Sequence, residues 1–244
     1  MQNFKVTIQY DGTHYHGWQI QPNGRTIQGE LTRIVSTLDH RPVTIYGAGR
    51  TDAGVHAEGQ VANFFVERTF EPHLLRDAIN GNLESDIRVL EVIPVPDAFN
   101  ARTSAIHKTY RYRIWTEDVI SPFVCRYAHH YRSGLDVVAM RSGSVALIGT
   151  HDYTAFTVSS SDALDHVRTI SALEIENKSN EIEIAITADG FLRYMVRTIV
   201  GTLIDVGRGK RAPASVATAL ESGDRAKAGP SAPAHGLTLV RVAY

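Results

Sequence analysis

The chain has 244 residues and a formal net charge of −1, with 43% hydrophobic and 21% charged residues, a balance that excludes a wholly disordered protein. No apolar run approaches the ~20 residues that a membrane-spanning helix needs, and the single cysteine, Cys125, excludes an internal disulfide. We therefore expect a folded, cytoplasmic protein of one large or two ordinary domains, without membrane association.

The first half of the chain shows hydrophobic patterns in the order β-α-β-β-α-β. Strict alternation predicts a strand over residues 4–10, and helical spacing over residues 27–38 predicts a helix with Thr26 as its N-cap. Further along, the patterns predict a short strand, a second strand, a helix opened by Pro72 and a third strand. Their ranges are 43–48, 60–66, 72–79 and 86–95.

The second half repeats this order with longer connections. The patterns predict strands at 110–115, 167–176, 181–187 and 237–242, and helices at 135–148, 190–206 and 213–221. The helix at 190–206 has a strongly amphipathic pattern, because its large apolar residues lie four positions apart.

The duplicated pattern predicts an α+β protein made of two ferredoxin-like or RRM-like β-α-β-β-α-β units. We expect the units to span residues 1–97 and 98–244, because the stretch after Asp97 is polar and flanked by prolines. We also expect their antiparallel sheets to join edge to edge into one continuous sheet, with an active-site cleft between the units.

A Gly-rich loop in the first half is the most informative segment of the sequence. Four glycines lie between Gly47 and Gly59, and they flank Arg50 and Asp52, which point the same way if the loop is extended. An ordinary loop with a surface ion pair is compatible with these residues. The pattern is not that of a dinucleotide or P-loop motif, and His56 has no partner at ligand spacing to indicate a metal site.

Charge is distributed unevenly along the chain. Four bases and no acid lie between residues 98 and 115, and five bases and one acid lie between residues 190 and 220. Twenty of the 25 basic residues are arginines, whose planar guanidinium suits phosphate. Each cluster is compatible with a solvated surface or with a nucleic-acid contact, so the net charge alone does not exclude an RNA partner.

The loop sequence GRTDAGVHA, followed by GQVANF, resembles the catalytic loop of the TruA-type tRNA pseudouridine synthases. Four more blocks resemble the same family in the same order. They are YDGTHYHGWQIQP, FNARTSAIHKTYRYRI, GTHDYTAF and ADGFLRYMVRTIVGTLIDVGRG. The resemblance extends over nearly the whole chain.

The resemblance implies an isomerase that converts uridine to pseudouridine at positions 38, 39 and 40 in the anticodon stem-loop of tRNA. It implies a homodimer that needs neither a cofactor nor a metal. Asp52 corresponds to the catalytic aspartate, Arg197 to the arginine that pairs with it, and Tyr110 to the tyrosine that stacks on the target base. Arg50 corresponds to the arginine that helps to take the nucleotide out of its stack.

The chemistry of these residue types agrees with such a reaction. A carboxylate can add to the sugar C1′ or to uracil C6, or can remove the 2′ proton, and a nearby arginine keeps it ionised. A tyrosine provides a stacking face for an extruded base, and Arg111 and Arg113 flank Tyr110 as candidate phosphate contacts. The residues alone favour Tyr110 or Tyr112 in the core and Arg197 on the polar face of a helix.

Two other functions compete with this interpretation. A non-catalytic, tandem RRM-like RNA-binding protein would share the aromatic and basic features, but it has no use for Asp52 in a Gly-rich loop. An Asp-dependent hydrolase would need a second acid, and the only one near Asp52 is Glu58.

Overall fold

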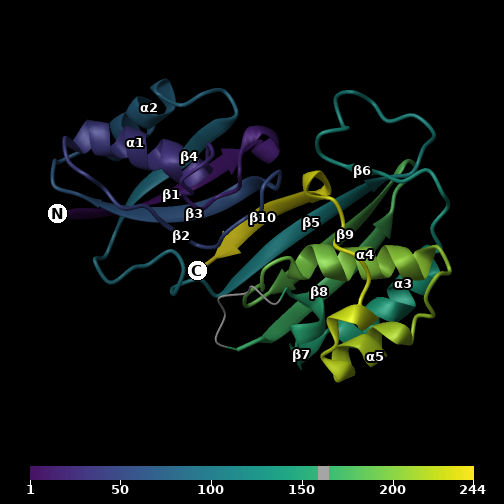
Figure 1. The fold of residues 1–244 in the computed structure, drawn as a ribbon. Coiled ribbons are helices and arrows are strands. Elements are labelled where there is room, and N and C mark those ends of the chain that lie inside the picture. Colours follow the sequence, from purple (N-terminus) through teal and green to yellow (C-terminus); the bar gives the residue numbers. More distant parts are fainter. Residues whose placement is uncertain (159–164) are drawn as a thin grey trace. The chain divides into compact units, whose positions relative to one another are not determined.

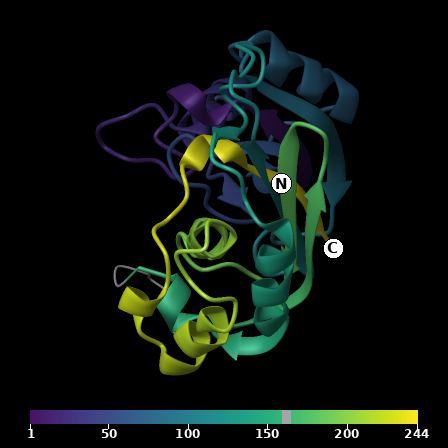
Figure 2. The same cartoon turned by 90° about the vertical axis from the view of Figure 1, so that its right-hand side faces the viewer.

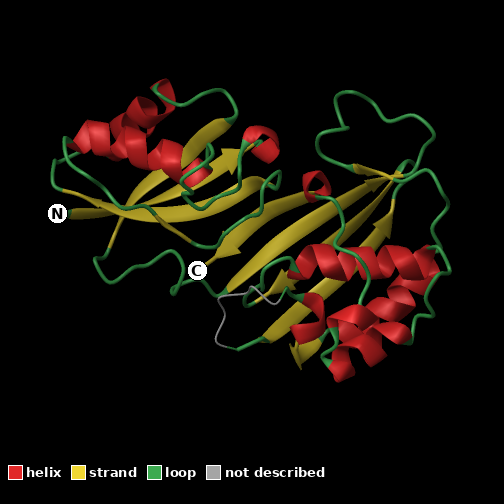
Figure 3. Cartoon of the chain, in the orientation of Figure 1, coloured by secondary structure: helices red, strands yellow, loops and turns green. Residues whose placement is uncertain are grey.

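The computed structural model describes residues 1–158 and 165–244 and divides into two compact units. The first unit contains residues 1–106 together with 239–244, and the second contains residues 107–238. Each unit combines helices with a β-sheet (Figures 1 and 3), so the predicted α+β class is confirmed. No helix in the described part of the chain is long and apolar enough to cross a membrane.

The first unit contains a sheet with the strand order β4-β1-β3, and β2 pairs with β3. All these pairs are antiparallel, and helices α1 and α2 lie together on one side of the sheet (Figure 1). The elements are β1 (Gln2–Tyr10), α1 (Ile27–Asp39), β2 (Tyr46–Gly47), β3 (His56–Val66), α2 (Pro72–Gly81) and β4 (Ile87–Val95). The later part of β10 (Leu237–Ala243) belongs to the same unit and is the neighbour of β3 in the strand order.

The predicted alternation and capping explain β1 and α1. Phe4, Val6 and Ile8 are buried on one face of β1, as the period-two pattern predicts. The hydroxyl of Thr26 accepts a hydrogen bond from the Gly29 N–H at 3.2 Å and caps α1. The predictions for β1 and α1 are therefore confirmed. The predictions for α2, which has Pro72 in its first turn, and for β4 are confirmed as well.

The structure places two boundaries of the first unit differently from the predictions. Strand β3 begins at His56, so the Gly-rich loop ends at Val55, and β2 contains two residues where the sequence pattern indicated six. Gly59 therefore belongs to the sheet, where an added Cβ would lie 2.4 Å from the Val240 carbonyl oxygen. Its lack of a side chain permits the close approach of β10 rather than shaping a loop.

The first unit extends beyond Asp97, where the sequence suggested a boundary. The Ala101 N–H donates to Asn63 Oδ1 at 2.9 Å, and the Tyr244 hydroxyl donates to the Ala101 carbonyl at 2.7 Å. These bonds attach residues 98–106 to β3 and to the C-terminal residue, so the change of unit falls after Ile106.

The second unit contains a sheet with the strand order β5-β9-β8-β7, and β6 pairs with β5. Helices α3, α4 and α5 lie on one side of this sheet, as Figure 2 shows from a second direction. The strands are β5 (His107–Trp115), β6 (His129–His130), β7 (Gly149–Asp152), β8 (Val167–Asn177) and β9 (Glu181–Ala188). The helices are α3 (Val137–Ser144), α4 (Met195–Gly207) and α5 (Ser215–Ser222).

Helix α4 differs from its prediction in its start and in its burial. It begins at Met195 rather than at residue 190, because Tyr194 has a left-handed backbone with φ 62° that a right-handed helix cannot continue. Phe191 lies before the helix and packs edge-on against Tyr110, with ring centroids 5.0 Å apart. All residues of α4 except Arg197 are buried, so the helix has no solvated face although its sequence pattern is amphipathic.

A buried carboxylate at the end of α1 provides a first prediction. Asp39 accepts hydrogen bonds from the N–H groups of Glu67 and Arg68 at 3.0–3.1 Å and from Arg41 Nε at 2.7 Å. Burial raises the pKa of this carboxyl, but these hydrogen bonds outweigh it and hold the pKa below its ordinary value. We expect Asp39→Asn to lower the free energy of unfolding at pH 7 by about 1–3 kcal/mol.

This stabilisation is complete above about pH 4 and is lost as the pH falls through the lowered folded-state pKa. Denaturant unfolding should therefore show a difference in the free energy of unfolding between wild type and Asp39→Asn that is smaller at pH 3 than at pH 7. The exposed Asp77 of α2 is the control, and Asp77→Asn should have little effect at either pH. The same free-energy difference at both pH values would contradict a stabilising role for the ionised Asp39 carboxylate.

Candidate active site

The loop that carries Asp52 is held by residues 10–19, the last residue of β1 and the segment after it, which we call the supporting segment. The hydroxyl groups of Tyr10 and Thr51 are 2.9 Å apart, and the Trp18 N–H donates to the Thr51 carbonyl at 3.1 Å. Burial raises the pKa of Tyr10 to about 12, so its hydroxyl stays protonated at neutral pH. Gln60 of β3 adds a bond from Nε2 to the Gly49 carbonyl at 3.0 Å. The loop is thus fixed at Gly49 and Thr51, directly before Asp52.

Two glycines allow the segment to approach this loop closely. An added Cβ at Gly12 would lie 2.0 Å from the Val55 carbonyl oxygen, and one at Gly17 would lie 2.5 Å from the Thr51 carbonyl oxygen. Gly17 also has φ +87°, a conformation that residues with a side chain rarely adopt. Both positions therefore require glycine. The block YDGTHYHGW therefore acts physically as a support of the loop.

His56 has a structural role at the start of β3. It is 3% exposed, and its Nδ1 accepts the Gly12 N–H at 3.0 Å. A ring nitrogen that accepts this bond is not available to a metal ion. Within residues 1–158 and 165–244 no group of three or more His, Cys, Asp or Glu side chains could hold one.

Asp52 and Arg50 both reach the surface of the first unit. Asp52 is half-buried and Arg50 is exposed, whereas Thr51 between them is buried, the alternation that their two-residue spacing predicts. The Asp52 carbonyl accepts the Val55 N–H at 3.1 Å, which closes a turn through Gly54 with φ +77°. Arg50 Nε donates to Gln19 Oε1 at 3.1 Å, so this guanidinium is also held by the supporting segment.

In the second unit, Tyr110 and Tyr112 have different environments on the same face of β5. Tyr112 is fully buried, and its hydroxyl donates to the Pro233 carbonyl at 2.9 Å. Burial raises the pKa of this hydroxyl, and the nearby charge of Arg197 opposes the shift. Tyr110 is 7% exposed and packs against Phe191. Both tyrosines are therefore buried, and Tyr112 is the more deeply buried of the pair that the sequence left open.

Arg111 and Arg113 lie on the opposite face of β5 from the two tyrosines, because successive side chains of a strand alternate. Both are half-buried. Arg113 is paired with Glu181 of β9, with Nη2 2.6 Å and Nε 3.0 Å from the same carboxylate oxygen. The structure therefore separates these arginines from the face of Tyr110, although the sequence places them beside it.

Arg197 is the only residue of α4 that is not buried. Its Nε donates to the Ala232 carbonyl at 2.7 Å, and its backbone carbonyl accepts the Ala232 N–H at 2.9 Å. It is therefore a fixed guanidinium on a buried helix, not a residue of a solvated helix face. The segment around Ala232 is a further part of the site that the sequence does not reveal, because its contacts with Arg197 are made by backbone atoms.

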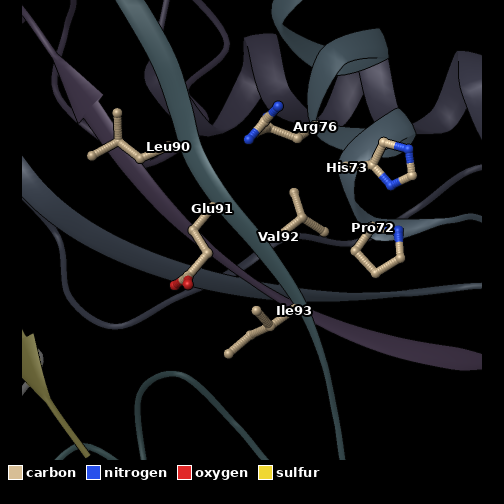
Figure 4. A pocket seen from close by; sticks show the side chains of 7 residues that line it. All are labelled: Pro72, His73, Arg76, Leu90, Glu91, Val92 and Ile93. Atoms are coloured by element: carbon tan, nitrogen blue, oxygen red, sulfur yellow. The ribbon is translucent and has the colours of Figure 1, made fainter.

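A shallow hollow of about 440 Å³ lies elsewhere in the first unit, between α2 and β4 (Figure 4). Its lining mixes charged and apolar side chains: Pro72, His73, Arg76, Leu90, Glu91, Val92 and Ile93. None of the site residues predicted from the sequence is among them, so the hollow provides no support for the predicted site.

The chain matches the family model described as tRNA pseudouridine synthase over residues 6–103 and 144–244. The chain belongs to the tRNA pseudouridine synthase family. It is therefore an enzyme, an isomerase that forms pseudouridine in tRNA. The matched ranges include Arg50, Asp52 and Arg197, and Tyr110 lies between them.

Full-length relatives support the same assignment. The chain is 44% identical to tRNA pseudouridine synthase A of Bacillus sp. (strain KSM-64) over 245 residues, which covers all of both chains. It is 41% identical to tRNA pseudouridine synthase A of Syntrophotalea carbinolica, with coverage of 100% of this chain and 97% of the relative. The tRNA pseudouridine synthase A of Brachyspira hyodysenteriae is 42% identical, with coverage of 100% and 99%.

The support of the Asp52 loop provides a second prediction. We expect Gly17→Ala to displace the loop, because the added Cβ would meet the Thr51 carbonyl and the residue would be strained at φ +87°. The free energy of unfolding should fall by about 1–3 kcal/mol, and pseudouridine formation should slow at least about tenfold.

Turnover on unmodified tRNA and denaturant unfolding, measured on the same preparations, check this prediction. Gly81→Ala is the matched control, because nothing lies within 4 Å of an added Cβ there at the last residue of α2. That variant should keep wild-type turnover and stability. Wild-type turnover in Gly17→Ala would show that the contact with Thr51 is not needed.

Proposed function

We propose that this enzyme isomerises uridines 38, 39 and 40 in the anticodon stem-loop of tRNA, with Asp52 as the catalytic carboxylate. The observation that carries the proposal is the placement of Asp52. Its side chain is half-buried beside a buried Thr51 whose hydroxyl and carbonyl are both bonded to the supporting segment. A residue whose neighbouring backbone is fixed before the substrate arrives loses less freedom during the reaction.

The proposed reaction breaks the N1–C1′ bond of uridine and forms a C5–C1′ bond. N1 gains a proton and C5 loses one, so the atoms and electrons balance without an oxidant or a reductant. The Asp52 carboxylate begins the reaction by one of three routes: addition to C1′, addition to C6, or removal of the 2′ proton. In this proposal Arg197 pairs with the ionised carboxylate and favours its charged form.

Tyr110 and Arg50 have proposed roles in holding the target nucleotide. Tyr110 would stack on the uracil and mediate proton transfer. Its ring is fixed edge-on by Phe191, and its exposed fraction of 7% leaves a limited face for a base. Arg50, which is exposed, would help to take the nucleotide out of its stack. Arg111 and Arg113 would contact phosphates on the other face of β5.

The proposal extends to the architecture and the assembly. We propose that both units are β-α-β-β-α-β units, and the strand order β4-β1-β3 with β2 on β3 supports this for the first. By resemblance, the two sheets would join edge to edge into one continuous sheet, with the active-site cleft between the units. By resemblance, the enzyme would be a cytoplasmic homodimer.

A catalytic role for Asp52 predicts a specific loss in Asp52→Asn. The amide keeps the size of the side chain but removes its charge and nucleophilicity. We expect normal thermal unfolding, normal tRNA binding and no detectable pseudouridine. In the wild-type reaction, pseudouridines mapped by position in an unmodified tRNA pool should appear at positions 38 to 40.

Glu58→Gln is the matched control for this prediction, because Glu58 is an exposed acid six positions further along the chain. It should form pseudouridine at the wild-type rate, whereas an enzyme with a pair of carboxylates would lose activity in both variants. Retained isomerisation in Asp52→Asn would refute the role of Asp52. Pseudouridine confined to other tRNA positions would refute the proposed substrate site.

A further inference from the structure

The residue that precedes α4 has an unusual backbone conformation. Tyr194 has φ 62° and ψ 2° at the N-cap of the helix, and its side chain makes no capping hydrogen bond. N-cap residues are typically Ser, Thr, Asp or Asn with an extended backbone. A left-handed tyrosine costs free energy that its surroundings must offset, and such residues persist where the structure requires them. The local helix signals therefore do not explain this conformation.

The conformation of Tyr194 places its ring against Arg197. The guanidinium carbon of Arg197 lies 4.8 Å from the centroid of the ring, and that of Arg193 lies 5.4 Å from it. Both distances are within the ~6 Å range of cation–π attraction. The ring of Tyr194 is half-buried, which strengthens this attraction relative to one in bulk water.

Further constraints on Arg197 come from the segment 229–233, which passes α4 on the way from α5 to β10 (Figure 1). The Gly229 N–H donates to Thr202 Oγ1 at 2.8 Å, and the Thr198 and Ser231 hydroxyls are 2.9 Å apart. Gly201 packs so closely that an added Cβ would lie 1.8 Å from the Pro230 carbonyl oxygen. The segment is therefore fixed to the helix along its length.

Together these contacts determine the orientation of one side chain. The Ala232 carbonyl accepts from Arg197 Nε at 2.7 Å, while the ring of Tyr194 lies against the guanidinium. A planar guanidinium with a hydrogen bond at Nε and an aromatic ring at 4.8 Å has little rotational freedom. Its direction is then set by the enzyme and not by the substrate.

We infer that Tyr194 is a positioning residue for Arg197 and that its left-handed backbone is retained for this purpose. The inference rests on the proposed function, because it takes Arg197 to be the partner of the catalytic carboxylate. Electrostatic partners accelerate a reaction most when they are oriented before the charge develops. Loss of the ring should therefore slow turnover while leaving tRNA binding largely unchanged.

Tyr194→Gly and Tyr194→Phe separate the ring from the backbone. Glycine adopts positive φ without strain, so Tyr194→Gly should unfold at or above the wild-type temperature. It should lower kcat about tenfold or more and change KM for tRNA less than about threefold. Tyr194→Phe keeps the ring and should stay within about threefold of the wild-type kcat.

Two further variants keep the test decisive. Asparagine also tolerates a left-handed backbone, so Tyr194→Asn should lower kcat as much as Tyr194→Gly does. His40→Gly is the matched control, because exposed His40, with φ 59° after α1, is the other left-handed non-glycine residue in the described part of the chain. His40→Gly should keep wild-type kcat. Wild-type kcat in Tyr194→Gly and Tyr194→Asn would overturn the inference.

Arg197→Ala distinguishes failure of this inference from failure of the proposed function. If Arg197→Ala abolishes turnover while Tyr194→Gly has wild-type kcat, Arg197 acts as proposed and needs no positioning by the ring. If Arg197→Ala keeps turnover, the proposed role of Arg197 is wrong, and the inference fails with it. A loss of kcat in Tyr194→Phe equal to that in Tyr194→Gly would also overturn the inference, because the ring would then not be the part that acts.

Discussion

The contact between Thr51 and the supporting segment, residues 10–19, is the interaction on which the rest of the active-site loop depends. The side chain of Thr51 is bonded to the Tyr10 hydroxyl and its carbonyl to the Trp18 N–H, so the residue beside Asp52 is fixed in two directions. The same segment holds Arg50 through Gln19 and the end of the loop through Gly12. A short N-terminal stretch thereby determines where the proposed catalytic carboxylate lies.

The sequence predicted the elements whose stability comes from burial of one apolar face. Strand β1 and helix α1 follow the periodicity of their apolar residues, and Thr26 caps α1 as its position indicates. The start of α4 could not be predicted in this way, because the left-handed backbone of Tyr194 is imposed by packing, and tyrosine has no propensity for it. Likewise, Gly59 looked like a loop residue because a close approach by another strand leaves no local pattern.

For the site, the sequence supplied the candidate residues but not the contacts that hold them. Asp52 and Arg197 were identified through a motif and a resemblance. The Ala232 carbonyl that binds Arg197 Nε, and the Thr51 carbonyl that binds the Trp18 N–H, are backbone groups, and backbone contacts between distant segments leave no side-chain signature. The different environments of Tyr110 and Tyr112 also depend on packing, since an alternating strand pattern treats the two residues alike.

These contacts imply that the Asp52 loop is built before tRNA binds. Hydrogen exchange of the backbone amides of Trp18, Gly54 and Val55 in the tRNA-free enzyme tests it most directly, because their N–H groups donate to Thr51, Tyr15 and Asp52. We expect these amides to be protected about as well as those within β3 and their protection to change little when tRNA is added. Rapid exchange in the free enzyme, with protection only after tRNA is added, would contradict it.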